Sequence, residues 1–278
     1  MATSPTVTLN NGVEIPQLGF GVFKVKPTET VSAVTTALRV GYRHIDTAEM
    51  YGNEKEVGLA ITASGLDRDD VFVTSKLDNN HHPYDDALAA FDRTLSDLGL
   101  EYVDLFLIHW PLPAVGDFVE TWRALESVYR DDRARAIGVS NFHADHLRRL
   151  LDETELLPAV NQIEAHPYLT QEPLRAFNAS HGIKTEAWSP IARGRVLDDP
   201  TIKAVVHRTG RTAAQVVLRW HIQLGNIVFP KSVRPDRIEE NFNIFDFELS
   251  GEDMAAISKL DRGERTGPDP DTFNYVPD

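Results

Sequence analysis

Short runs rich in β-branched and aromatic residues recur along this chain, and each is followed by a stretch whose apolar residues have helical spacing. There are eight of these runs: PQLGFG, RHID, DVFVTSK, VDLFLIHW, RAIGVS, AVNQIE, KTEAWS and NIVFPKS. Their interiors are mostly apolar, which is typical of parallel strands that are covered on both faces. Eight alternating units in 278 residues predict an α/β fold, the closed (β/α)8 TIM barrel.

A doubly wound open sheet is the alternative that the same alternation allows. That fold carries a glycine-rich phosphate-binding turn at the start of a helix. The GFGVFK stretch supplies Gly19 and Gly21 but no third glycine that opens a helix, which argues against the open sheet. The intervening stretches have the stripes of amphipathic helices, as between Tyr84 and Leu98 and behind a predicted cap at Asp117.

The two ends of the chain fall outside the barrel units. The stretch TVTLNNGVEIP predicts a β-hairpin that turns at Asn10, Asn11 and Gly12, and we expect it at the bottom of the barrel. The final stretch, RGERTGPDPDTFNYVPD, is an acidic, proline-rich tail that is expected near the opposite mouth, where the strands end. Because no linker interrupts the barrel period, residues 1–278 are predicted to form a single domain.

Charge and composition exclude several classes of partner. The chain has 42 acidic and 28 basic residues, and its net charge of -14 repels nucleic acid and anionic lipid. It has no cysteine, which excludes a disulfide scaffold and a thiolate metal site. The first residues lack a signal-peptide pattern, and no window reaches the ~18 apolar residues of a membrane span. We therefore expect a cytoplasmic monomer with no nucleic-acid or membrane partner.

Functional side chains of a barrel gather at the carboxyl ends of its strands. In this chain the predicted strand ends and the loops after them carry mostly polar or ionisable residues: Asp46, Tyr51, Lys76, His109, Ser140, Asn141, Gln162, Trp188, Ser189, Lys231 and Ser232. Taken singly, each has an ordinary explanation as a turn, a helix cap or a solvated strand end. Their convergence at one mouth instead indicates a site.

Lys76 and Tyr51 suggest acid–base chemistry. A lysine at the end of a buried strand needs an anionic partner, which Asp46 can supply. A lysine beside a phenol lowers the pKa of the phenol, so Tyr51 would become a usable general acid. His109 can orient a carbonyl or relay a proton. The alternative is a barrel lyase that uses Lys76 as a Schiff-base nucleophile, with Tyr51 and Asp46 as acid and base.

The settings of these residues resemble those of a known family. The segments GYRHIDTAEMYGNE, VFVTSKL, LFLIHWP, IGVSNF, NQIEAHP, EAWSPI and FPKSVRPDRIEEN are similar to aldo-keto reductases, in the family's order and from Leu9 to Leu260. Among its members, the chain resembles most the microbial reductases of the 2,5-diketo-D-gluconate reductase type. The resemblance implies an NADP-dependent oxidoreductase that reduces aldehydes or ketones, such as small dicarbonyls, aromatic aldehydes or keto sugars, to alcohols.

The resemblance also implies catalytic roles. Tyr51 would protonate the carbonyl oxygen as the general acid while hydride comes from nicotinamide C4. Lys76 would lower the pKa of Tyr51, and Asp46 would hold Lys76 in place. His109 would orient the carbonyl, and a histidine at this position favours carbonyl reduction over the double-bond reduction of members that carry glutamate there.

Cofactor-binding residues follow from the same resemblance. They are Ser140, Asn141 and Gln162 for the nicotinamide carboxamide, Trp188 with Ser189 for the nicotinamide ring, and Lys231, Ser232, Val233, Arg234, Arg237, Glu240 and Asn241 for the adenosine 2'-phosphate and the adenine. Bidentate guanidinium contacts favour a phosphate that NADP has and NAD lacks, so NADPH/NADP+ is the expected cofactor. The ordinary alternative is a solvated helix start, because this last segment has no net positive charge.

Phe23, Asp78 and Trp110 are the predicted substrate-binding residues. Asp78 stands where many relatives carry a tryptophan that lines the pocket. A carboxylate in place of a large aromatic should widen the pocket and disfavour anionic substrates such as sugar acids. The loops after His109 and Ser189 are short, which predicts an open mouth and broad specificity.

Two histidine pairs, His81–His82 and His143–His146, raise a metal hypothesis. Neither pair has a third ligand close by in sequence, and the family that the chain resembles needs no metal. We therefore predict no metal and expect solvated histidines. A remaining alternative function is a barrel that binds NADPH as a redox sensor or accessory subunit with little turnover.

Overall fold

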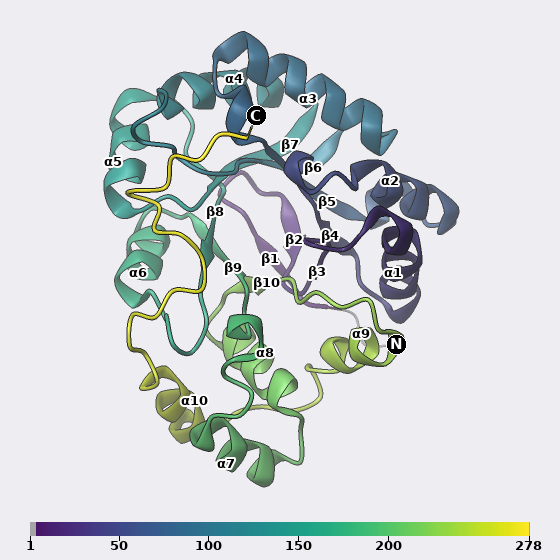
Figure 1. Ribbon diagram of the computed structural model, residues 1–278, viewed down its shortest axis with the longest axis vertical. Helices are drawn as coiled ribbons and strands as arrows, with labels where there is room; N and C mark the ends of the chain where they lie inside the picture. Colours follow the sequence, from purple (N-terminus) through teal and green to yellow (C-terminus); the bar gives the residue numbers. More distant parts are fainter. Residues whose placement is uncertain (1–3, 278) are drawn as a thin grey trace.

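A closed parallel barrel forms the centre of the protein in this computed structural model, which describes residues 4–277 (Figure 1). Its strands are β3 (Phe20–Gly21), β4 (His44–Asp46), β5 (Phe72–Leu77), β6 (Val103–Ile108), β7 (Ala134–Ser140), β8 (Val160–Glu164), β9 (Lys184–Trp188) and β10 (Ile227–Val228). They form an eight-stranded sheet in chain order, and Leu18 makes a parallel bridge to Val228 that joins the last strand to the first. The predicted (β/α)8 barrel is confirmed, and the open sheet is wrong.

Helices surround the barrel on its outside (Figure 1). They are α1 (Pro27–Val40), α2 (Glu54–Ala63), α3 (Tyr84–Leu98), α4 (Phe118–Arg130), α5 (Ala144–Glu153), α6 (Glu172–Ser180), α7 (Pro200–Thr209), α8 (Ala213–Gln223), α9 (Pro235–Phe242) and α10 (Gly251–Ser258). The helices α7 and α10 are additions to the strand–helix alternation, and they share an apolar cluster with α8. No helix among residues 4–277 is long and apolar enough to cross a membrane.

The predicted helical stripes lie against the barrel. Phe91 of α3 and Trp122 of α4 are fully buried in the main core, as the spacing of their apolar neighbours predicts. Asp117 begins α4 as expected, because its Oδ1 accepts the backbone N–H of Val119 at 3.1 Å. The helices thus cover the outside of the barrel, and the carboxyl ends of the strands are left to form a site.

The N-terminal hairpin covers the bottom of the barrel. It consists of β1 (Thr6–Thr8) and β2 (Glu14–Pro16), and Gly12 takes the positive φ of 86° that its tight turn requires. Ile15 is fully buried beneath the strands, and the Asn10 side chain donates to the backbone carbonyl just before β8. These contacts confirm the predicted hairpin and its place at the barrel bottom.

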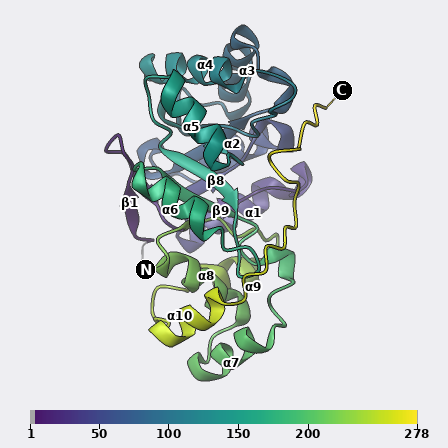
Figure 2. The ribbon, with the colours of Figure 1, turned by 90° about the vertical axis from the view of Figure 1, so that its left-hand side faces the viewer.

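The C-terminal tail, residues 262–277, runs along the other face of the molecule (Figure 2). The backbone N–H of Thr266 donates to Glu164 at the end of β8, at 2.6 Å. Further on, the Tyr275 carbonyl accepts from the Asn79 side chain, which follows β5, at 2.9 Å. The tail therefore lies at the carboxyl ends of the strands, as predicted.

Candidate active site

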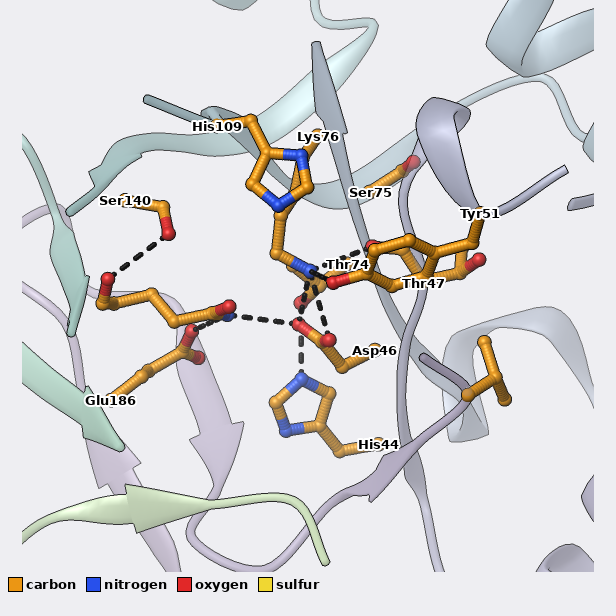
Figure 3. Close-up of polar contacts among 12 residues, drawn as sticks. His44, Asp46, Thr47, Tyr51, Thr74, Ser75, Lys76, His109, Ser140 and Glu186 are labelled. Atoms are coloured by element: carbon orange, nitrogen blue, oxygen red, sulfur yellow. Dashed lines mark hydrogen bonds and ion pairs between the residues drawn. The ribbon is translucent and has the colours of Figure 1, made fainter. Parts of the chain in front are cut away.

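Asp46 and Lys76 form a buried ion pair at the ends of the neighbouring strands β4 and β5 (Figure 3). Lys76 Nζ lies 2.8 Å from Oδ1 and 2.9 Å from Oδ2 of Asp46, and it donates to the Thr47 carbonyl at 2.8 Å. Burial by itself would lower the pKa of Lys76, but the charges of Asp46 and Tyr51 act the other way and raise it. The lysine is a fixed positive charge beneath the mouth.

Tyr51 is brought next to this ion pair by a short 3-10 turn, η1 (Glu49–Tyr51), between β4 and α2. Its hydroxyl lies 3.5 Å from Lys76 Nζ. Burial raises the pKa of Tyr51 above 10.0, while Lys76 lowers it and Asp46 raises it. Lys76 thus acts on this pKa in the predicted direction, but desolvation of the phenol outweighs its effect.

His109 directly follows β6 and faces the same group of side chains (Figure 3). Its ring centroid lies 5.8 Å from that of Tyr51. Burial and the charge of Lys76 lower the pKa of His109 well below 6.5, so the imidazole is neutral. A neutral imidazole has one N–H donor and one acceptor, and the buried Nδ1 has no partner within residues 4–277.

Gln162 links the ion pair to a residue that the sequence analysis missed. Its Nε2 donates to Asp46 Oδ2 at 2.9 Å and to Glu186 Oε2 at 2.8 Å. Glu186 lies on β9 two positions before Trp188, so both side chains are on the same face of the strand. This period of two was the signal that could have identified Glu186 from the predicted role of Trp188.

Asn141 is the centre of a second set of contacts, at the ends of β7 and β9. Its φ of 64° is a left-handed conformation that asparagine tolerates well. Its Nδ2 donates to the His109 carbonyl at 2.9 Å and to Ser140 Oγ at 3.1 Å, and its Oδ1 accepts from Trp188 Nε1 at 2.8 Å. Ser189, with φ of 50°, completes the bend after Trp188. The structure brings these four predicted cofactor residues together.

The predicted phosphate-binding segment follows β10 and enters α9. Its exposed members are Lys231, Val233, Arg234 and Arg237, and its less exposed members are Ser232, Glu240 and Asn241. The Arg234 guanidinium is bound to Asp236 by two contacts of 3.1 and 2.5 Å. Within residues 4–277, neither Lys231 nor Arg237 has a carboxylate oxygen within 4.0 Å. The two arginines therefore differ, which the sequence did not indicate.

The predicted substrate residues lie around Tyr51 and along the tail. The ring centroid of Phe23 is 5.0 Å from that of Tyr51, and the Phe23 side chain is 47% exposed. The Trp110 ring packs against the Phe273 ring of the tail, with 4.3 Å between the ring centroids. The tail therefore borders the mouth on this side, whereas the short loops predicted an open mouth. Asp78 accepts the N–H of the next residue and caps a 3-10 turn, and burial raises its pKa.

The histidines are less solvated than expected. His82 is 6% exposed, and burial lowers its pKa to about 4. His143 is part-buried, and its Nδ1 lies 2.7 Å from Asp271 Oδ1. Together with Asp269, these two residues offer ligand atoms within 4.8 Å of one another, but Arg265 donates to His143 Nε2 at 2.9 Å. The Arg265 guanidinium thus already supplies a positive charge to this cluster. The absence of a metal stays a prediction.

The contacts of Lys76 decide between the two kinds of chemistry considered for it. A Schiff-base nucleophile must be an amine that has lost its proton. Here the nitrogen is held by Asp46 and the Thr47 carbonyl, and the raised pKa keeps it protonated. The geometry therefore opposes the lyase and supports a site in which Lys76 acts through its charge.

Barrel and site together are those of a (β/α)8 protein whose ionisable side chains gather at the carboxyl end of the barrel, where enzymes of this fold have their active sites. The particular family follows from comparison with known proteins. The model of the Aldo/keto reductase family matches residues 17–262, and the chain belongs to this family.

Individual relatives agree with this assignment. An aldo-keto reductase of Mycobacterium sp. (strain KMS) is 54% identical over 273 residues, which cover 98% of this chain and 99% of that protein. The glyoxal reductase of Bacillus subtilis (strain 168) is 49% identical over 271 residues, which cover 97% and 98%. A solved aldo-keto reductase from Bombyx mori, in complex with NADP, has a TM-score of 0.93 at 37% identity and covers 99% of each chain. The 2,5-diketo-D-gluconate subtype stays a prediction.

Proposed function

We propose that this chain is an NADPH-dependent carbonyl reductase in which Tyr51 is the general acid. The observation that carries the proposal is the distance of 3.5 Å between the Tyr51 hydroxyl and Nζ of the buried, protonated Lys76. A positive charge so close favours release of the phenolic proton as the carbonyl oxygen gains negative charge. Bound NADPH supplies the hydride for the carbonyl carbon.

His109 and Tyr51 would hold the carbonyl oxygen between them. The imidazole is neutral, so it can donate an N–H to this oxygen without adding a second positive charge beside Lys76. Tyr51 donates the proton that completes the alcohol and takes a new one from solvent afterwards. Asp46 keeps Lys76 charged and in place through this cycle.

The residues present fit NADPH at both of its ends. Ser140 Oγ accepts from the Asn141 amide and donates to the Gln162 backbone carbonyl, and these three residues at the ends of β7 and β8 are the proposed carboxamide site. Trp188 would pack on the nicotinamide ring, with Ser189 beside it. At the other end, the exposed cations Lys231 and Arg237 lie beside the start of α9, which favours a phosphate. Ser232, Val233, Arg234, Glu240 and Asn241 complete the proposed cofactor residues.

The proposed substrates are small uncharged carbonyl compounds, with glyoxal and methylglyoxal first. The glyoxal reductase similarity supports this class. Phe23 offers apolar surface beside Tyr51, Trp110 offers more beside the tail, and the Asp78 carboxylate disfavours anions. We also propose a cytoplasmic monomer in which residues 1–278 unfold as one domain, which light scattering, cell fractionation and urea unfolding would test.

The test follows NADPH absorbance at 340 nm with methylglyoxal, 4-nitrobenzaldehyde, xylose and a keto sugar acid, with NADH in parallel. The wild-type protein should oxidise NADPH, and Tyr51→Phe should cut turnover at least ~100-fold while NADPH affinity is nearly kept. A mutant with almost full turnover would show that Tyr51 is not the acid. Tight NADPH binding with no turnover on any compound would instead support a redox sensor or accessory subunit.

A further inference from the structure

Glu186 is a fully buried carboxyl group to which the proposed reaction assigns no role. It shares one amide nitrogen, Gln162 Nε2, with Asp46, at 2.8 Å and 2.9 Å respectively. Asp46 in turn binds Lys76, whose Nζ reaches the Tyr51 hydroxyl. Figure 3 shows these contacts running from Glu186 to Asp46 and on to Lys76. A continuous chain of polar contacts thus connects Glu186 to the proposed general acid.

The charges around Glu186 leave no cation for it. Asp46 and Lys76 neutralise each other, and they are the charged groups that act on Glu186. The neighbours paired with Glu186 in the sheet, Gln162 on β8 and Ile227 on β10, carry no charge. His44, which lies near Asp46 on β4, is neutral because burial lowers its pKa to about 4. An ionised Glu186 would add an uncompensated negative charge to the barrel interior.

The protonation of Glu186 follows from this arrangement. Burial and the nearby Asp46 raise its pKa to about 8. At neutral pH the group is mostly a carboxylic acid, and its Oε2 accepts from Gln162. The buried Oε1 has no partner within residues 4–277. Glu186 therefore changes its charge in the pH range in which the proposed reductase would work.

We propose that Glu186 is a positioning residue that sets the acid strength of Tyr51 through Gln162, Asp46 and Lys76, and that Tyr51 becomes a weaker acid when Glu186 loses its proton. The inference rests on the proposed function, in which Tyr51 is the acid. Its cause is electrostatic, because a negative Glu186 offsets part of the field of Lys76 at the phenol. A weaker acid delivers its proton to the carbonyl oxygen more slowly.

Two neutral variants and one control make the test specific. Glu186→Gln copies the protonated acid, with its Oε1 as the acceptor for Gln162 and its amide in place of the hydroxyl. Glu186→Met is a second neutral side chain of similar size. Glu54→Gln is the matched control, because Glu54 is also buried but binds Ser75 and Thr94 between α2, β5 and α3. Glu54 has no contact with Asp46 or Tyr51 among the hydrogen bonds of residues 4–277.

The first measurement is the melting temperature between pH 5 and 9 without cofactor. A carboxyl group can have a higher pKa in the folded protein than in the unfolded chain. Such a group destabilises the native state as the pH rises from the lower of these two pKa values to the higher. Wild type and Glu186→Gln should therefore melt close together at pH 5, and the variant should melt at higher temperature as pH approaches 8 and above. A difference that does not grow with pH would overturn the inference.

The second measurement is the single-turnover rate of NADPH oxidation with 4-nitrobenzaldehyde between pH 6 and 9.5. Tyr51, with its raised pKa, stays protonated over this range. The wild-type rate should fall about threefold through a step near pH 8, because Tyr51 becomes a weaker acid when Glu186 ionises. Both neutral variants should lack the step, and Glu54→Gln should keep it.

The outcomes separate this inference from the proposed function. A step that persists in Glu186→Gln and Glu186→Met, or is missing from the wild type, refutes the role of Glu186 while the reductase stands. A purely structural Glu186 would change melting temperature and leave the rate profile as it is, which also refutes the role. Absence of turnover in every variant refutes the proposed function and this role with it, even where melting shows that Glu186 titrates.

Discussion

Arg237 and Arg234 lie three residues apart, but the structure predicts different consequences when each is replaced by alanine. Arg237 has no carboxylate within 4.0 Å among residues 4–277, whereas Arg234 is bound twice by Asp236. A charge-assisted bond to phosphate contributes ~1.5–3 kcal/mol, and solvent screening of an exposed arginine reduces this. Arg237→Ala should therefore weaken NADPH binding by ~1–2 kcal/mol, roughly 5- to 30-fold. Binding of NADH, which lacks the phosphate, should change less than about twofold.

Arg234→Ala is the matched control, because its guanidinium must leave Asp236 before it can bind a phosphate. We expect less than about a threefold loss of NADPH affinity in this variant. Titration of tryptophan fluorescence with NADPH and NADH, at 50 and 300 mM salt, measures the affinity of both variants for each nucleotide. The loss of NADPH affinity in Arg237→Ala should be smaller at the higher salt. Equal weakening of both nucleotides by Arg237→Ala, or a larger loss in Arg234→Ala, would refute this reasoning.

Three further variants test other contacts. Asp46→Asn leaves Lys76 buried without its carboxylate, so urea unfolding should show a loss of ~3–5 kcal/mol, and a loss below ~1 kcal/mol would contradict the ion pair. Burial raises the pKa of Glu54 from 4.5 to about 7, so the wild type loses stability as pH rises through this interval. Glu54→Gln should therefore be more stable than the wild type by up to ~3 kcal/mol at pH 8, with no such difference at pH 4.5. Gly267→Ala places a methyl group 2.5 Å from Trp188 Cη2, which is too close for this segment of the tail to keep its position. Amide hydrogen exchange of the tail should therefore become faster, and unchanged exchange would argue against this close packing.

The fold and the proposed catalytic residues were predictable because a barrel converts chain order into spatial order. Once eight strands are recognised, the residue at each strand end must face the same mouth. Asp46 and Lys76 are adjacent in space because β4 and β5 are adjacent in the sheet. The prediction required only strand positions, which the apolar runs indicate, and the roles of the residues came from the family resemblance.

The features that sequence did not predict depend on burial and on side-chain conformation. The direction of the pKa shift of Tyr51 is decided by how far the phenol is desolvated, which its neighbours in sequence do not reveal. Arg234 and Arg237 are the same residue type, and only the arrangement of the side chains shows that Asp236 binds Arg234. The period of two from Trp188 places Glu186 on the site face of its strand, but only the structure shows that Gln162 lies between the carboxyl groups of Glu186 and Asp46.

The route of the tail matters for anyone who attaches this protein to a solid support. The hairpin near the chain start covers one end of the barrel, and the last residues bind Asn79 and Ala114 at the other. In Figure 2 the hairpin and the C-terminal tail lie on different sides of the molecule. A tether fused before the hairpin would orient the strand ends away from the surface, whereas one fused after Tyr275 would pull on the segment that packs against Trp110.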